Sequence, residues 1–71
     1  MDTNKLQSIR AALEVTQERM AELLHCALVS YKRYELGTRE IPSYIAMSAR
    51  ALEFLHKNGL LKKFENFLKK S

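Results

Sequence analysis

Residues 16–37 read TQERMAELLHCALVSYKRYELG and decide the fold, because they predict two short helices joined by a tight corner. The segment opens with Thr16, a residue type that caps helices, and closes with Gly37, a residue type that commonly ends them. Between these signals, apolar residues recur at helical spacing in both halves: Met20, Leu23 and Leu24, then Leu28, Tyr31 and Tyr34. This outline is that of a helix-turn-helix, whose second helix enters the major groove of DNA.

The 71 residues make one small domain, because this length is near the lower limit for a hydrophobic core. Hydrophobic residues make up 46% of the chain, and two glycines and one proline leave few breaks, so we expect an all-α fold. Asp2 is followed by Thr3 and Asn4, either of which we expect to cap the first helix. The spacing predicts five helices, over residues 4–14, 17–24, 28–36, 42–57 and 60–70.

The sequence argues against a disulfide, a metal site, a membrane-spanning segment and an enzyme active site. Cys26 is the only cysteine, and neither His25 nor His56 has a ligand partner at a recognisable spacing, so no metal or cofactor is expected. There is no signal-peptide pattern and no apolar run near the roughly 20 residues that span a bilayer, which favours a cytoplasmic protein. A nucleophile with a matching base, paired carboxylates and a phosphate loop are also missing, so we do not expect an enzyme.

Positive charge is concentrated toward the C-terminus. The net charge is −1 over residues 1–27, +2 over residues 28–50 and +3 over residues 51–71, for a total of +4. The excess of positive charge begins where the second helix of the 16–37 segment begins, which suits a polyanionic partner. An ordinary surface with a lysine-rich tail explains the same total equally well.

The stretch TQERMAELLHCALVSYKRYELGTREIP resembles the Cro/XRE-type helix-turn-helix of phage and bacterial repressors, whose pattern is roughly sQ..lA..lgvs...i..yE.G.r.p. The resemblance covers about residues 5 to 55 and implies a five-helix, lambda-repressor-like DNA-binding domain. The segment RYELGTREIPSYIAMSARAL also resembles a subgroup of small phage-encoded regulators, among them anti-CRISPR-associated repressors. The positions in register with the family pattern are Gln17, Ala21, Leu24, Tyr34, Glu35, Gly37 and Arg39.

The resemblance implies roles for individual residues. Arg10 and Glu35 occupy the positions of a structural ion pair in the family. The phosphate-contacting positions are Gln17, Lys32 and Arg39, and the base-reading positions are Leu28, Val29, Ser30 and Arg33. Arg33 can donate two hydrogen bonds to guanine O6 and N7, whereas Leu28 or Val29 would pack on a thymine methyl group. Core packing is the alternative for those two apolar residues, and a solvated polar residue is the alternative for Gln17.

Two residues depart from the family pattern at the corner between the two helices. His25 stands where the family has a glycine, and Ala27 stands where the family has a serine or threonine cap. The first change removes a residue that adopts the left-handed conformation freely, and the second removes a cap worth about 1 kcal/mol. The corner is therefore either strained or reshaped, although histidine tolerates positive φ better than most residues.

We expect a DNA-binding transcriptional regulator, most simply a repressor that binds an inverted-repeat operator in double-stranded DNA as a homodimer. One recognition helix reads only a few base pairs, so specific binding calls for two copies. The C-terminal helices, 43–57 and 60–70, carry the expected dimerisation residues Tyr44, Met47, Phe54, Leu60, Phe64, Phe67 and Leu68. Three alternatives stay open: this stripe completes the monomer core, the chain is an antitoxin-type module that binds a partner protein, or the basic last helix lies on anionic lipid.

Overall fold

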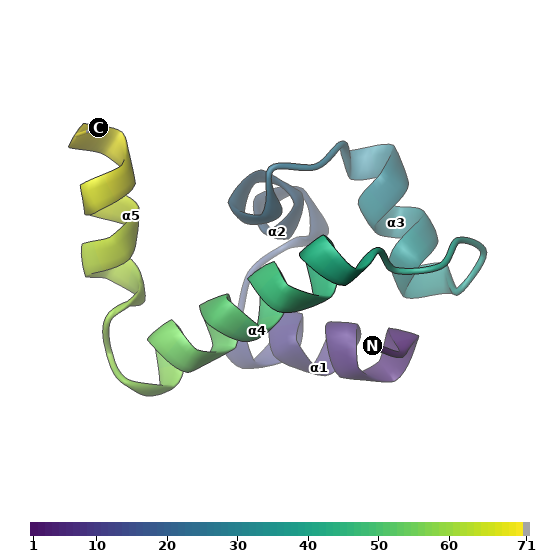
Figure 1. Cartoon of the computed structure of the whole chain (residues 1–71), viewed down its shortest axis with the longest axis horizontal. Coiled ribbons are helices and arrows are strands. Elements are labelled where there is room, and N and C mark those ends of the chain that lie inside the picture. Colours follow the sequence, from purple (N-terminus) through teal and green to yellow (C-terminus); the bar gives the residue numbers. More distant parts are fainter. Residues whose placement is uncertain (71) are drawn as a thin grey trace.

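The computed structural model describes residues 1–70, which form five α-helices and no strand. In chain order these are α1 (Thr3–Leu13), α2 (Gln17–Leu24), α3 (Leu28–Leu36), α4 (Ser43–Lys57) and α5 (Leu61–Lys70). The predicted all-α fold class is thereby confirmed. Figure 1 shows α4 running across the molecule beside α1, with α2 and α3 on its other side and α5 at the end opposite α3. No helix in the described part is long and apolar enough to cross a membrane.

The hydrophobic core lies between α1, α2, α3 and α4. In α1, for example, Leu6, Ile9 and Leu13 recur every three or four residues and are buried on one side. Helix α5 contributes no buried residue, and only Leu61 at its start packs against the core. The first four helices therefore define the fold, and α5 is attached at its edge. The remaining buried apolar residues are Met20, Ala21, Leu24, Tyr31, Tyr34, Ile45, Ala49 and Leu52.

The helix starts show one correction to the sequence-based expectation. Thr16 caps α2 as predicted, because its hydroxyl accepts a hydrogen bond from the backbone N–H of Arg19. Helix α1, however, is capped by Asp2, whose carboxylate accepts from the N–H of Lys5 over 2.7 Å, and not by Thr3 or Asn4. Aspartate is as good a cap as asparagine, and Thr3 is left as the first helical residue with its hydroxyl free for another partner.

The corner between α2 and α3 keeps a left-handed turn in spite of its missing glycine. His25 has φ 56°, and the N–H of Cys26 donates to the carbonyl of Ala21 over 3.0 Å, which closes the end of α2. Ala27 then starts α3 from an extended conformation without a side-chain cap. Of the two alternatives for this corner, the structure has the strained one, and residues 25–27 are the whole connection.

The other helix ends fall within one residue of their predicted positions. Helix α3 ends at Gly37, which has φ 79°, as predicted. Helix α1 ends one residue early, because Glu14 is left-handed with φ 57°. Pro42 precedes the first turn of α4 as its cap residue, and α5 starts at Leu61 where residue 60 was expected. Such shifts are ordinary at helix ends.

Candidate nucleic-acid interface

One side of α3 faces solvent while the other side is buried. Tyr31 and Tyr34 lie in the core, whereas Val29, four residues from Arg33, is 59% exposed. Helical periodicity places these two exposed residues on the same side, with Leu36, 75% exposed, one turn further on. The helix thus presents a narrow outer face with a guanidinium between two apolar side chains.

The predicted base-contacting residues differ in how far they are buried. Leu28 is half-buried and packs against the core, which agrees with the alternative of core packing for this residue. Val29 is exposed. Ser30 is half-buried at one edge of the outer face, and Lys32 is fully open to solvent at the other edge. Among the residues of α3 with a predicted DNA contact, Val29, Lys32 and Arg33 are therefore the exposed ones.

Arg39 comes from the loop after α3 and lies back along the same helix. Its Nη1 donates a hydrogen bond to Ser30 Oγ over 3.4 Å, and its guanidinium carbon is 5.9 Å from the centre of the Tyr34 ring. Such a distance is within the range of cation–π attraction. Ser30 and Tyr34 are one helical turn apart, so the guanidinium is held against the edge of α3.

Glu35 gathers hydrogen bonds from three helices. Its carboxylate accepts from Arg10 on α1, with Nε to Oε2 at 2.7 Å and Nη2 to Oε1 at 3.2 Å. Gln17 on α2 donates from Nε2 to Oε1 over 3.1 Å, and the hydroxyl of Tyr31 on α3 donates to Oε2. The ion pair that the resemblance implied is therefore present, and it has two further donors that the sequence analysis did not assign.

The pKa values in this cluster shift so that Glu35 and Arg10 stay charged and Tyr31 stays neutral. Burial alone raises the pKa of Glu35, but the hydrogen bonds from Arg10, Tyr31 and Gln17 outweigh it and leave that pKa below its ordinary value. The hydrogen bond to Glu35 raises the pKa of Arg10. Burial, reinforced by the bond to Glu35, raises the pKa of Tyr31, so its hydroxyl stays protonated and donates. Tyr31 is fully buried, so its hydroxyl is not available for contact with a DNA phosphate.

A polar stripe on α1 holds the C-terminal end of α3. Thr3 Oγ1 donates to the carbonyl of Tyr34 over 3.0 Å, and Gln7 Nε2 donates to the carbonyl of Glu35 over 2.9 Å. With Arg10, these residues recur at helical spacing on one side of α1. The stripe bonds two carbonyls of the last turn of α3, where helices leave such groups without partners. The spacing was visible in the sequence, but its target on α3 was not.

The side chain of Gln17 is anchored, in contrast to the solvated residue considered above. One hydrogen of its Nε2 amide group points to Glu35, and the trigonal geometry of an amide leaves the second hydrogen on Nε2 in a different direction. Gln17 is also the first residue of α2, beside the backbone N–H groups that open this helix. That end of α2 therefore combines N–H donors with an oriented amide.

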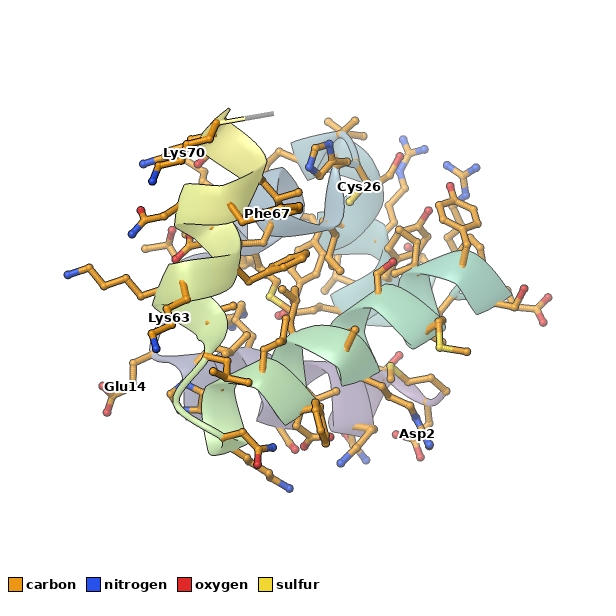
Figure 2. The ribbon with its side chains drawn as sticks, turned by 60° about the vertical axis from the view of Figure 1, so that its left-hand side comes forward. Asp2, Glu14, Cys26, Lys63, Phe67 and Lys70 are labelled. Atoms are coloured by element: carbon orange, nitrogen blue, oxygen red, sulfur yellow. The ribbon has the colours of Figure 1, made fainter. Side chains whose placement is uncertain are left out.

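Two groups of basic residues lie at separate places in the structure. Lys32, Arg33 and Arg39 lie on or beside α3. The lysines of α5 lie at the opposite end of the molecule, because Figure 1 places α5 and α3 at opposite ends. In Figure 2, Lys63 and Lys70 project from the outer side of α5, away from the other helices. The α5 lysines are Lys62, Lys63, Lys69 and Lys70.

The predicted dimerisation residues are all exposed; six of them lie on α4 or α5, and Leu60 lies just before α5. Met47 is 70% exposed and Phe67 is 66% exposed, although Figure 2 shows Phe67 on the side of α5 that faces the rest of the molecule. An open groove of about 310 Å³ runs between α5 and α2 above α4. An ion pair between Arg19 on α2 and Glu65 on α5 bridges the two walls. The groove is lined by Leu23, Leu24, His25, Ser48, Ala51, Leu52, Phe64 and Leu68.

The remaining candidates for chemistry are potential metal ligands, the cysteine and the corner histidine. Within residues 1–70, no group of three or more His, Cys, Asp or Glu side chains is placed to hold a metal ion. Cys26 is half-buried, and burial raises the pKa of its thiol, which disfavours the reactive thiolate. His25 is exposed at the corner and serves the backbone turn.

Comparison of the chain with protein-family models, with curated proteins and with solved structures found no significant match in any of the three.

Proposed function

We propose that this chain is a sequence-specific, double-stranded DNA-binding regulator in which α2 and α3 form a helix-turn-helix and α3 is the recognition helix. The observation that carries the proposal is the outer face of α3, where Arg33 is exposed while the opposite side of the helix is fixed through Glu35 to α1 and α2. A recognition helix needs both properties, because base-edge hydrogen bonds require a donor that reaches the groove and a helix that holds its angle.

The exposed residues Val29, Lys32 and Arg33 of α3 each have a chemical partner in DNA. The guanidinium of Arg33 can donate two hydrogen bonds to O6 and N7 of guanine, and Val29 can pack on the methyl group of thymine. Lys32 at the edge of the face supplies a charge to the phosphate backbone, and the hydroxyl of Ser30 can donate or accept. Leu28 contributes only its exposed part, since the rest packs on the core.

Gln17 supports the proposal from α2. Its second Nε2 hydrogen and the first N–H groups of α2 form a small donor set at a helix N-terminus, which suits one phosphate oxygen. Glu35 fixes the direction of the amide, so the contact costs little ordering when DNA binds. In this reading the buried ion-pair cluster both stabilises the fold and prepares a backbone contact.

The proposal includes a homodimer that uses the apolar surface of α4 and α5. Tyr44, Met47 and Phe54 are exposed along one side of α4, and the apolar residues Phe64, Phe67 and Leu68 of α5 are exposed as well. Large apolar side chains gathered at a surface suit association with a second copy. A twofold dimer on an inverted repeat would also double the number of bases read.

A second candidate function is an antitoxin-type module that binds a partner protein and regulates its own operon. The open groove of about 310 Å³ beside α5 favours this function, because α5 forms one wall of the groove and has no buried residue. The two candidate functions predict different co-purification results. A repressor should elute as a homodimer, whereas an antitoxin should elute with a second, different protein.

Selection of bound fragments from a random-sequence DNA pool tests the proposed function. The purified chain should enrich an inverted repeat, and Arg33→Ala should lose the preference at one position of each half-site while it keeps its helical circular-dichroism spectrum. A folded wild-type chain that enriches no sequence would contradict the proposal.

A further inference from the structure

We propose that Arg39 is a specificity-determining residue that donates to base edges from the edge of α3. This inference rests on the proposed function and refines it. The family resemblance by itself places Arg39 on the phosphate backbone. The contacts of Arg39 in this structure favour the bases, because they hold its guanidinium against the recognition helix.

The backbone after α3 turns back toward the helix. Gly37 adopts φ 79°, and the N–H of Thr38 donates to the carbonyl of Arg33 over 3.1 Å. This turn brings Arg39 beside Ser30 in the first turn of α3, and the 3.4 Å hydrogen bond to Ser30 Oγ joins residues nine apart in the chain. The Tyr34 ring lies under the guanidinium at 5.9 Å.

These two contacts suit a guanidinium better than they suit any other cation. A planar group can stack on the Tyr34 ring while one N–H bonds Ser30, and four of its five N–H donors then stay available. A phosphate anchor needs only a positive charge, and a mobile one is sufficient. Base reading instead requires a donor fork held near one direction, which the cation–π contact and the hydrogen bond favour.

The neighbourhood of Arg39 leaves its charge available for DNA. Within residues 1–70, neither Arg39 nor Arg33 makes an ion pair with an acidic side chain. Arg33 is one helical turn from Ser30, so the residue that Arg39 contacts is a neighbour of Arg33 on the surface of α3. Guanine presents two acceptors in the major groove to a guanidinium that approaches from this side.

The substitution Arg39→Lys separates the two roles, because it keeps the charge and removes the fork and the stack. The probes are the duplex that the wild-type chain selects from a random-sequence pool and a shuffled duplex of the same base composition. We expect Arg39→Lys to bind the selected duplex roughly tenfold more weakly and the shuffled duplex within about twofold of wild type. The dependence of affinity on salt should not change, since the number of phosphate contacts is the same.

Arg50→Lys is the matched control, because it makes the same change at an exposed position of α4 to which no DNA contact is assigned. It should leave both affinities within about twofold. Ser30→Ala supplies a second measurement: combined with Arg39→Lys, it should add little further loss on the selected duplex, since both changes disrupt one arrangement.

The outcomes separate this inference from the proposed function. If the wild-type chain selects a site and Arg39→Lys binds it as tightly as wild type does, Arg39 is a phosphate anchor and the inference is overturned alone. If the wild-type chain binds selected and shuffled duplexes equally, no base is read, and both the proposed function and this inference are overturned.

Discussion

Arg10 donates two hydrogen bonds to the carboxylate of Glu35, at 2.7 Å from Nε and 3.2 Å from Nη2. The side chain of Glu35 is 5% exposed and that of Arg10 is 28% exposed, so the acidic partner is the more deeply buried one. Arg10 also donates from Nη1 to the carbonyl of Val15 over 3.1 Å, in the connection between α1 and α2. One side chain thus links α1, the start of α2 and the end of α3.

Removing one partner of this ion pair should destabilise the fold more than removing both. We expect Arg10→Ala to lower the free energy of unfolding by roughly 3 kcal/mol, because a buried carboxylate then lacks its main partner. Glu35→Ala should cost less, since Arg10 can still reach water, and the double variant should recover part of the loss. Urea unfolding of the three variants and wild type gives the coupling energy. Strictly additive losses would show that the pair contributes nothing as a pair.

The same cluster predicts loss of stability in acid. The native pKa of Glu35 lies below its ordinary value of 4.5, so the native state binds fewer protons than the unfolded state does in that range. Its contribution is complete above about pH 4.5 and declines as the pH falls through the lowered native value. Thermal midpoints from pH 7 to pH 3 should therefore fall more steeply for wild type than for the Arg10→Ala/Glu35→Ala double variant.

Glu53→Gln is the control for the acid experiment. Hydrogen bonding from Lys5 lowers the pKa of Glu53, but this carboxylate lies at the surface, where solvent screens its ion pairs. The variant should keep most of the wild-type decline in acid. An equal decline in wild type and the double variant would mean that other carboxylates govern the acid behaviour.

The corner between α2 and α3 can be improved by supplying the cap it lacks. Ala27→Ser places a hydroxyl where it can accept from an open N–H in the first turn of α3, and should stabilise the fold by about 1 kcal/mol. Thr16→Ala is the matched change at α2, where it removes an existing cap and should cost a similar amount. Thermal unfolding measures both. If only Thr16→Ala has an effect, the backbone at Ala27 does not present its N–H groups to a cap.

Much of the fold was predictable because its signals are local. Thr16, Gly37 and Pro42 each mark a helix boundary by a property of a single residue, and the periodicity of apolar residues identified the buried sides. The sequence analysis predicts Thr3 or Asn4 as the cap of α1, although Asp2 belongs to the same class of capping residue and is the cap in the structure. The left-handed turn at His25 could be stated only as one of two alternatives, since the sequence does not give backbone angles.

The polar contacts of the candidate site depend on tertiary packing, and most were not predictable. The hydrogen bonds from Thr3 and Gln7 reach carbonyls of α3 that lie 31 and 28 residues away. Every residue has a carbonyl, so the sequence does not mark the acceptor. The bond between Tyr31 and Glu35 is different, because their spacing of four residues places them side by side on α3 and was visible as a signal.

The proposed dimer depends on the apolar side of α5, which carries Phe64, Phe67 and Leu68. Phe64→Lys with Phe67→Lys should convert the dimer to a monomer, because two charges then face the apolar surface of α4 and α5. Phe67→Lys alone should weaken the dimer, since Phe67 is the more exposed of the two. Light scattering over a range of protein concentrations measures the mass, and circular dichroism reports whether the helices persist.

The opposite side of α5 supplies the control for the dimer experiment. Lys63→Gln with Lys70→Gln changes two residues that point away from the other helices and should leave the dimer intact. A double phenylalanine variant that stays dimeric would contradict this interface. A wild-type monomer whose double phenylalanine variant unfolds would show instead that the stripe completes the monomer.

The most direct test of DNA reading by α3 compares Arg33→Ala, Lys32→Ala and Gln17→Ala on the selected duplex and its shuffled counterpart at several salt concentrations. Arg33→Ala should cost about 1 to 3 kcal/mol on the selected duplex and relax the preference at one position in each half-site. Lys32→Ala and Gln17→Ala should weaken both duplexes about equally, and only Lys32→Ala should lower the salt slope, by roughly one unit. If Arg33→Ala weakens both duplexes equally while Lys32→Ala alone changes the preference, α3 is rotated in the groove by about a third of a turn and Arg33 is not the residue that reads the bases.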